Sequence, residues 1–353
     1  MIEKLSHFPV NWIDGMSINK THFTAVQNFV SDSVRDAVGV HTSMIGYGLL
    51  PVQNSIKINL IIDNHKLLRI KVEECHAVTP NGSRIEIGGE LTENLSLSIP
   101  YLEAVKELKE NQEAVLLACI SVNPFKRTPY GEPDPEENPP RYPYTLPEYS
   151  LNLIPEDELK NTNGFGGNYL TIGKILVHSG ESRIDDNYIP PCVSVSSHQK
   201  LQELYTEIDR FYGQIEVYAT QIAQKIHSKK QNNELAMMME LMSDKTLNYL
   251  GMEINKFRWS SPYAPPAEML VSVVALARVL KNFIDARSGA GKEQLLNYFA
   301  EWCNVSQGDF DTVFTETINT DYNHNQMDKS IAKITKFMTT LEDLFSVLSR
   351  LDY

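Results

Sequence analysis

Cysteine is rare in this chain, and long apolar runs are missing from it. The four cysteines lie far apart without a Cys-x-x-Cys spacing, which predicts buried, reduced thiols rather than disulfides or a zinc site: Cys75, Cys119, Cys192 and Cys303. Every apolar run is shorter than the ~20 residues of a membrane span, and the first ten residues lack the basic and apolar regions of a signal peptide. We therefore expect a cytoplasmic protein with no direct membrane insertion.

The chain is also poor in basic residues, with 32 Lys and Arg against 45 Asp and Glu and a formal net charge of −13. Phosphate binding needs clustered Lys and Arg, so we expect no nucleic-acid partner. The 42% hydrophobic and 22% charged fractions are typical of a globular protein. Because single cores stop growing beyond roughly 250 residues, a length of 353 residues predicts two or three domains.

The most informative stretch runs from Val10 to Phe23. Its distinctive residues are Trp12, Gly15, Met16, His22 and Phe23. Glycine adopts positive φ at no cost, which predicts a turn at Gly15 in an extended arm, and Asn19 is a suitable helix cap. From Phe23 onward apolar residues recur at helical spacing, which predicts an amphipathic helix: Val26, Val30, Val34, Ala37 and Val38. On chemistry alone, the arm is a hydrophobic staple that fastens the terminus to a domain.

After this helix the apolar period changes from about 3.6 to 2, which predicts antiparallel strands. We expect strands within 56–62, 68–72, 85–87, 115–122, 149–153 and 169–177, a turn at 80–83 and a short helix at 101–111. The segment 124–147 holds eight of the 18 prolines, and proline removes backbone donors, so it predicts a long exposed loop. Its acidic residues lack the spacing of an EF-hand, and we expect no metal there.

A second distinctive stretch, Ile184–Pro191, closes the strand-rich part. Its double proline, Pro190 and Pro191, predicts a stiff exit from the first domain. Asp185 and Asp186 form a carboxylate pair, but no histidine, nucleophile or phosphate loop is close in sequence, so general acid-base catalysis is not expected. Besides the two prolines, the distinctive residues of the stretch are Asp185 and Tyr188.

The remainder of the chain predicts helices. Apolar residues at alternating steps of three and four predict a long helix with a narrow seam that requires an intramolecular bundle or another chain: Leu201, Leu204, Ile208, Phe211, Ile215, Tyr218 and Ile222. Further helices are expected at 233–257, 267–286, 292–303, 309–320 and 326–351. The segment Ser288–Glu293 contains Gly-Ala-Gly-Lys, but a phosphate loop needs glycine at Ala286 and Ser or Thr at Glu293. We expect no nucleotide or other cofactor.

Both distinctive stretches resemble the TssK family, the baseplate subunit of the bacterial type VI secretion system. The first stretch is similar to the pattern Val-x-Trp-x-x-Gly-Met-x-Leu-x-Pro-x-His-Phe, with Ile18 and Lys20 as departures, and the second to Ile-Asp-x-x-Tyr-Ile-Pro-Pro. Pattern and resemblance together predict an α+β protein. Its expected parts are a β-sandwich-like shoulder with one leading helix at 1–191, a helical-bundle neck at 192–287 and a small helical head at 288–353.

The resemblance implies a homotrimer without enzymatic activity, metal or cofactor. It implies that the shoulder docks on the wedge proteins TssF and TssG, with Trp12, Gly15, Met16, His22 and Phe23 at the assembly interface. The neck would hold the trimer through the seam that begins at Leu201, and the head would contact the membrane complex. Because the tail after Gly291 is shorter than the usual head, its partner is the least determined. A phage-like receptor-binding or tail adaptor protein is the alternative, and an enzyme ranks third.

Overall fold

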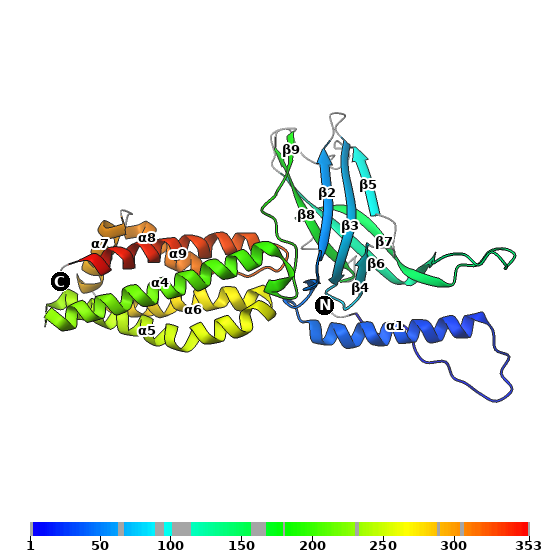
Figure 1. The fold of residues 1–353 in the computed structure, drawn as a ribbon, viewed down its shortest axis with the longest axis horizontal. Coiled ribbons are helices and arrows are strands. Elements are labelled where there is room, and N and C mark those ends of the chain that lie inside the picture. Colours follow the sequence, from blue (N-terminus) through cyan, green and yellow to red (C-terminus); the bar gives the residue numbers. More distant parts are fainter. Residues whose placement is uncertain are drawn as a thin grey trace. The chain divides into compact units, whose positions relative to one another are not determined.

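The computed structural model describes residues 3–62, 67–88, 95–100, 114–156, 167–178, 181–229, 233–287, 290–303 and 307–351. They belong to two compact units, Met1–Val193 and Ser194–Tyr353. After one leading helix the first unit is built from antiparallel strands, whereas the described part of the second unit is helical (Figure 1). The predicted α+β class is therefore confirmed. The expected helix at 101–111 lies outside the described residues.

The first unit begins with an extended arm, residues 3–19, and helix α1 (Lys20–Thr42). In its first sheet, strand β3 (Leu67–Val78) pairs with all the others: β1 (Gly48–Leu49), β2 (Ile56–Ile62), β4 (Arg84–Ile87) and β5 (Leu95–Pro100). The second sheet has the order β7 (Tyr144–Pro155), β6 (Ala114–Tyr130), β8 (Tyr169–His178) and β9 (Glu181–Ile184). The strands expected from the two-residue period are confirmed.

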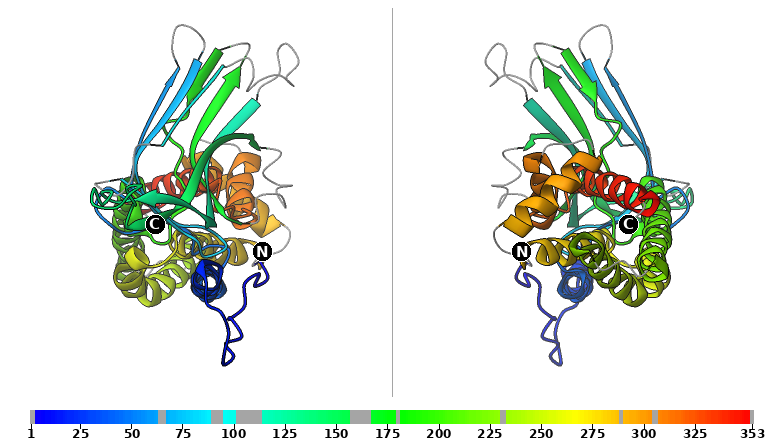
Figure 2. Two further views of the ribbon diagram at one scale, coloured as in Figure 1. Left: turned by 90° about the vertical axis from the view of Figure 1, so that its right-hand side faces the viewer. Right: turned by 90° about the vertical axis from the view of Figure 1, so that its left-hand side faces the viewer.

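The two sheets meet closely around Gly173 on β8. A Cβ atom at this glycine would lie 2.9 Å from Cδ1 of Leu60 on β2, so the missing side chain lets the sheets approach. Alternate strand residues point into the core between them, as the two-residue period requires. The buried members include Leu68, Ile70, Val72, Leu117, Ile120, Leu170 and Ile172. The end-on views in Figure 2 show the blue strands of the first sheet beside the green strands of the second.

The segment 124–147 corrects the expectation of a loop. Strands β6 and β7 continue into it as a hairpin, with pairs from Arg127–Pro147 to Tyr130–Tyr144. Here β6 pairs with β7 alone, whereas nearer its start it also pairs with β8. Each hairpin strand therefore has one free edge, where a proline removes no ladder hydrogen bond. The hairpin tip, residues 131–143, is the part without strand structure apart from one isolated bridge, Asp134–Arg141.

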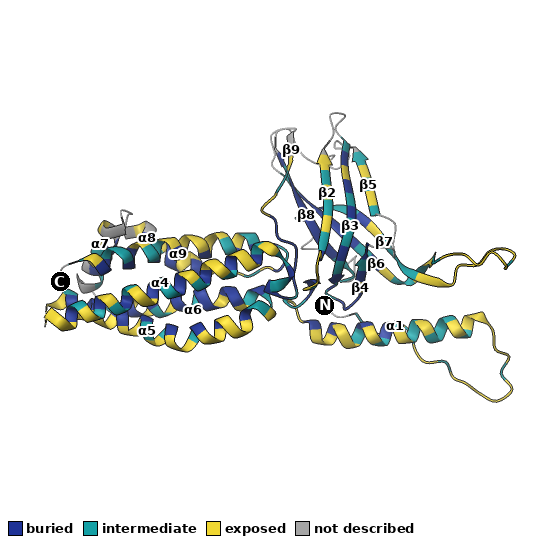
Figure 3. Ribbon diagram, viewed as in Figure 1, coloured by how far each residue is buried: buried dark blue, intermediate teal, exposed yellow. Residues whose placement is uncertain are grey.

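The second unit contains the helices α4 (Gln199–Lys229), α5 (Glu234–Ser260), α6 (Pro266–Asp285), α7 (Ala290–Cys303), α8 (Gln307–Ile318) and α9 (Met327–Arg350). Helix α4 packs against α5 and α9, and α6 packs against α5, α8 and α9. The expected helices are confirmed, with ends that differ by a few residues. Figure 3 shows buried residues on the inner sides of these helices and exposed residues outside.

Aromatic side chains fill the centre of this bundle. The buried ring of Tyr212 meets Phe257 edge-on at 5.2 Å between centroids, and its hydroxyl lies 2.7 Å from Oγ of Ser272. A buried tyrosine hydroxyl needs such a partner, because an unpaired polar group in a core costs about 1–3 kcal/mol.

Helix α9 runs back along α4, and residues 194–353 form one compact unit. A separate head beginning at residue 288 stays a prediction.

Three of the four cysteines are buried in the first unit, as the sequence predicts. Cys75, Cys119 and Cys192 carry free thiols. Burial raises the pKa of Cys75 and Cys119 to about 12, so both remain protonated at neutral pH. The thiolate is the reactive form, and these side chains are therefore inert packing residues. The side chain of Cys303 lies outside the described residues.

Candidate assembly surface

A buried ion pair fixes α1 to the strands of its own unit. Arg35 donates from Nε and Nη2 to Oδ1 of Asp32, at 2.9 and 2.7 Å, and neither side chain is more than 4% exposed. The other carboxylate oxygen of Asp32 accepts the backbone N–H groups of Ser6 and His7, at 2.7 and 2.9 Å. The pair therefore joins the arm to the helix, and it satisfies both oxygens of a fully buried carboxylate.

The same pair reaches the turn between β3 and β4. Nη1 of Arg35 donates to Oδ1 of Asn81 at 2.6 Å, and Oδ1 of Asn81 also accepts the backbone N–H of Glu3. Nδ2 of Asn81 donates to the Glu3 carboxylate at 2.9 Å and to Oδ1 of Asn168 at 3.3 Å. These residues, from the arm, α1, the β3–β4 turn and the start of β8, are called the clasp: Glu3, Ser6, Asp32, Arg35, Asn81 and Asn168.

The clasp acts on the ionisation of Asp32. Burial alone would raise its pKa, but the hydrogen bonds from Ser6, Arg35 and His7 and the charge of Arg35 lower the pKa to about 2. A carboxyl group with a lowered folded pKa stabilises the fold above its unfolded pKa of about 4. This contribution, on the order of 2 kcal/mol, is lost as the pH falls from about 4 to about 2. At neutral pH the clasp is fully formed.

Two glycines let α1 approach the β3–β4 turn closely. Gly82 has a φ of 87°, and a Cβ atom there would meet the backbone oxygen of Arg35 at 2.2 Å. On the helix, a Cβ atom at Gly39 would lie 2.9 Å from the backbone oxygen of Asn81. The helix is therefore held by backbone contact as well as by the clasp, and its rotation about its own axis is fixed.

The consequence is that α1 turns its polar side inward. The buried residues of the helix are Asp32, Arg35, Gly39 and Thr42. The apolar residues that the sequence places on one face are exposed or half-buried, with Phe23 at 62%, Val30 at 52% and Val34 at 58% exposed. The interpretation of the arm as a hydrophobic staple was wrong, because polar contacts fasten it and the apolar residues remain outside.

The structure places the five predicted interface residues on the arm and the first turn of α1, where they are mostly exposed. The ring of Trp12 lies 6.0 Å from that of His22. Gly15 turns the arm with a φ of 78°, as predicted, and Met16 is half-buried. His22 closes a capping box, because its Nδ1 accepts the backbone N–H of Asn19 at 3.2 Å.

The sequence did not predict the exposure of four further apolar residues of the arm, which are Leu5, Phe8, Ile13 and Ile18. The arm projects as a loop beyond the start of α1 (Figures 1 and 2), so a stretch of apolar side chains is presented to solvent. The sequence pattern also did not predict the clasp. Its one local signal is the pair Asp32 and Arg35, three residues apart on the side of the helix opposite the apolar residues.

The residues at the exit of the first unit have structural roles. Tyr188 is buried and donates from its hydroxyl to Oγ1 of Thr171 at 2.7 Å, and Asp185 forms a turn in which its backbone oxygen accepts the N–H of Tyr188. Pro190 and Pro191 are buried, and the backbone oxygen of Pro191 accepts the N–H of Leu49 at 2.7 Å. The double proline is therefore a packed part of the first unit rather than a free linker.

The seam of α4 lies inside its own bundle. Six of its seven residues are buried and the seventh, Tyr218, is half-buried. The buried members are Leu201, Leu204, Ile208, Phe211, Ile215 and Ile222. Of the two possibilities that the spacing leaves open, the structure has the intramolecular bundle. A contact between copies of the chain therefore requires a different surface.

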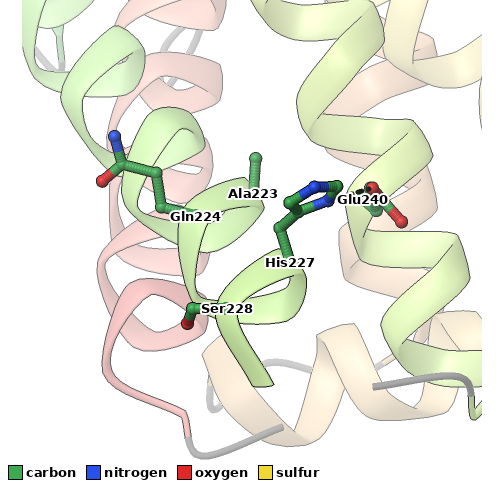
Figure 4. Close-up of a pocket in the computed structure, with 5 residues that line it drawn as sticks. All are labelled: Ala223, Gln224, His227, Ser228 and Glu240. Carbon is green, nitrogen blue, oxygen red and sulfur yellow. Dashed lines mark ion pairs between the residues drawn. The ribbon is translucent and has the colours of Figure 1, made fainter. Parts of the chain in front are cut away.

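A depression in the second unit lies between α4 and α5 and has a volume of about 510 Å³. Its lining residues are Ala223, Gln224, His227, Ser228 and Glu240 (Figure 4). Nδ1 of His227 lies 3.9 Å from the carboxylate of Glu240, and both side chains are open to solvent. Such an exposed pair lacks the burial that tunes catalytic groups. Among the described residues, no three His, Cys, Asp or Glu side chains gather as a metal site.

No helix in the described parts of the chain has both the length and the apolar character to cross a bilayer.

Residues 58–347 match the bacterial type VI secretion family described by the names VasE, ImpJ and EvfL. No curated protein sequence matches the chain.

Several solved structures share the fold. A crystal structure of TssK has a TM-score of 0.54 at 14% identity, over 95% of this chain and 69% of that one. TssK from the EAEC type VI secretion system in complex with a nanobody gives 0.52 at 12%, over 91% and 99%. A chain of a TssK-TssF-TssG baseplate subcomplex gives 0.52 at 11%, over 96% and 99%. At these identities the likeness is one of fold.

Proposed function

Since the family match spans most of its length, the chain belongs to the bacterial type VI secretion family that includes VasE and ImpJ, and we propose that it is a structural subunit of the secretion baseplate. In this role it binds other proteins and performs no chemistry. The exposed apolar residues of the arm support this role and indicate which surface binds the other proteins. A polar clasp holds the arm in place while its apolar residues stay in water, which is an arrangement for docking.

The arm is the proposed contact for wedge proteins of the TssF and TssG type. Structures with such partners exist for proteins of the same fold. The aromatic and aliphatic arm residues, Phe8, Trp12, Ile13 and Ile18, have the character of interface anchors. The hairpin of β6 and β7 projects toward the same side of the unit (Figure 1), and a ring contact between His7 and Phe125, 4.1 Å between centroids, joins the two. Arm and hairpin therefore offer one composite surface.

The remaining parts of the proposal rest on the family resemblance. The protein acts as a homotrimer in the cytoplasm, at the secretion apparatus docked on the inner membrane. The helices of the second unit form the neck, and the C-terminal region, residues 288–353, contacts the membrane complex.

A phage-like receptor-binding or tail adaptor protein is the second candidate, because the resemblance extends to the attachment domains of such proteins. It would recognise a cell-surface glycan rather than wedge proteins. The family match over residues 58–347 favours the secretion baseplate.

The proposal predicts that Trp12→Ala weakens binding to the TssF- and TssG-type proteins of the same cell by at least about tenfold, because tryptophan is enriched among the residues that carry most of the binding energy of an interface. The matched control is Trp259→Ala. This tryptophan is 80% exposed on the second unit, whereas Trp12 is 50% exposed. Binding is measured by biolayer interferometry with the purified full chain. Equal affinities for the two variants, with unchanged circular dichroism, would remove the arm from the interface.

A further inference from the structure

The hairpin of β6 and β7 presents tyrosines to solvent beyond the end of the second sheet. Tyr142 and Tyr144 are 48% and 66% exposed, and the ring of Tyr144 lies 6.4 Å from that of Tyr130, its partner on the opposite strand. Directly paired residues share a face of a hairpin, so these two rings form one aromatic surface. Figure 3 shows the hairpin as mostly exposed. Tyrosine joins a flat apolar ring to a polar hydroxyl, and it is enriched at protein interfaces.

The tip of the hairpin, residues 131–143, is held in shape by its own contacts. The backbone N–H of Asp134 donates to the backbone oxygen of Arg141 at 3.0 Å, and Oδ1 of Asp134 accepts the N–H of Glu136 at 3.0 Å. Arg141 donates from Nε and Nη2 to the two carboxylate oxygens of Glu137, at 2.7 and 2.9 Å. Five prolines within the tip restrict its backbone further. A surface that is ordered before binding loses little conformational entropy when a partner docks.

The tip is strongly acidic. Four carboxylates and one guanidinium give it a net charge of −3, and the guanidinium, that of Arg141, is already paired with Glu137. The ion pairs between described residues include none of the other three carboxylates, which belong to the exposed residues Glu132, Asp134 and Glu136. These charges repel nucleic acid, anionic lipid and acidic proteins, and they attract cationic side chains.

Arginine is the side chain that matches both features of this surface. Its planar guanidinium stacks on an aromatic ring and donates to a carboxylate through two parallel hydrogen bonds. The tip itself contains such a bidentate pair, between Arg141 and Glu137. Lysine supplies the charge but neither the flat surface nor the fork of donors. Tyrosine rings beside exposed carboxylates therefore fit a partner segment that carries several arginines.

We propose that the hairpin tip, together with Tyr130 and Tyr144, docks an arginine-bearing segment of another protein. The arm offers apolar side chains, whereas this surface binds through charge and stacking, so the two recognise different chemistry. The inference goes beyond the proposed function, because it holds whichever protein supplies the segment. Since exposed charges are screened by salt, the association weakens as the ionic strength rises.

The test measures how the purified full chain binds a fluorescent peptide with three arginines separated by glycines, by fluorescence anisotropy at low ionic strength. The triple variant Glu132→Gln, Asp134→Asn and Glu136→Gln is expected to weaken binding at least about tenfold, because it removes three attractive charges and keeps the acceptor oxygen of residue 134. Circular dichroism verifies that the variants fold. The matched control removes as many exposed carboxylates from the second unit and should bind as the wild type does: Glu207→Gln, Glu216→Gln and Asp244→Asn.

A second comparison separates recognition of arginine from a general attraction of cations. Tyr144→Ala should weaken binding of the arginine peptide about two- to fivefold and change binding of the matching lysine peptide less. Tyr263→Ala, which removes an exposed ring from the second unit, should change neither.

Two results would overturn the inference. In the first, the triple variant at the tip binds the arginine peptide as tightly as its control does. In the second, the wild type binds the arginine and lysine peptides equally and Tyr144→Ala affects neither. Both results leave the contact between the arm and wedge proteins untouched, because Trp12→Ala tests that contact separately.

Discussion

At the scale of single residues, the arrangement depends on one buried pair. Asp32 and Arg35 link the arm, α1 and the β3–β4 turn, and apart from a bond between Asn168 and Glu3 the hydrogen bonds of the clasp involve one of them or Asn81. No reading of the sequence could have assembled the clasp, because Glu3, Asn81 and Asn168 come together only through long-range folding. The cap at Asn19 and the turn at Gly15 were predictable, since each depends on its nearest neighbours.

Removing the cation of the clasp should therefore be costly. Arg35→Ala leaves Asp32 buried without a counter-ion, and we expect the free energy of unfolding of the first unit to fall by about 3 kcal/mol or more. Arg84→Ala is the control, because Arg84 is half-exposed and pairs with Glu86 on the surface of β4, a contact worth about 1 kcal/mol or less. Urea unfolding monitored by circular dichroism measures both variants. Equal losses of unfolding free energy would show that the buried Asp32–Arg35 pair stabilises the first unit no more than a surface ion pair does.

At the scale of elements, periodicity predicted the helices and strands but not what covers them. The amphipathic pattern of α1 predicts an apolar face, and the structure shows that this face points outward. The seam of α4 is the converse case, since a pattern compatible with association between chains is buried by α5, α6 and α9. The hairpin at 124–147 was missed because five of its eight prolines lie in the tip at 131–143, and the other three lie in strands that pair on one side only along the hairpin, where proline is tolerated.

The seating of α1 on the β3–β4 turn gives a second test. Gly82 and Gly15 both have positive φ, at 87° and 78°, but only a side chain at Gly82 would collide with α1. Gly82→Ala should lower the free energy of unfolding of the first unit by about 2 kcal/mol more than Gly15→Ala, which strains the backbone alone. Urea midpoints of the two variants provide the comparison. If the two midpoints agree within error, α1 does not pack against the β3–β4 turn at Gly82.

At the scale of the whole molecule, the division into a strand-rich and a helical part followed from the change of period near residue 196. The structure divides the chain at Val193 and Ser194, within a few residues of the exit predicted at Pro191. In the helical part, α9 returns to α4 and joins the last residues to the same unit. The docking partners are the part that no pattern in the sequence specifies physically. They follow from the family resemblance and from which apolar surfaces remain uncovered.

The central claim is that the first unit docks on wedge proteins of a type VI secretion baseplate. Cross-linking mass spectrometry on the assembly purified from its own cell tests it most directly, because the arm carries two exposed lysines, Lys4 and, at the start of α1, Lys20. The account predicts cross-links from these lysines to TssF- or TssG-type proteins. Cross-links to those proteins from the helical unit alone, or a purified assembly without any baseplate protein, would contradict it.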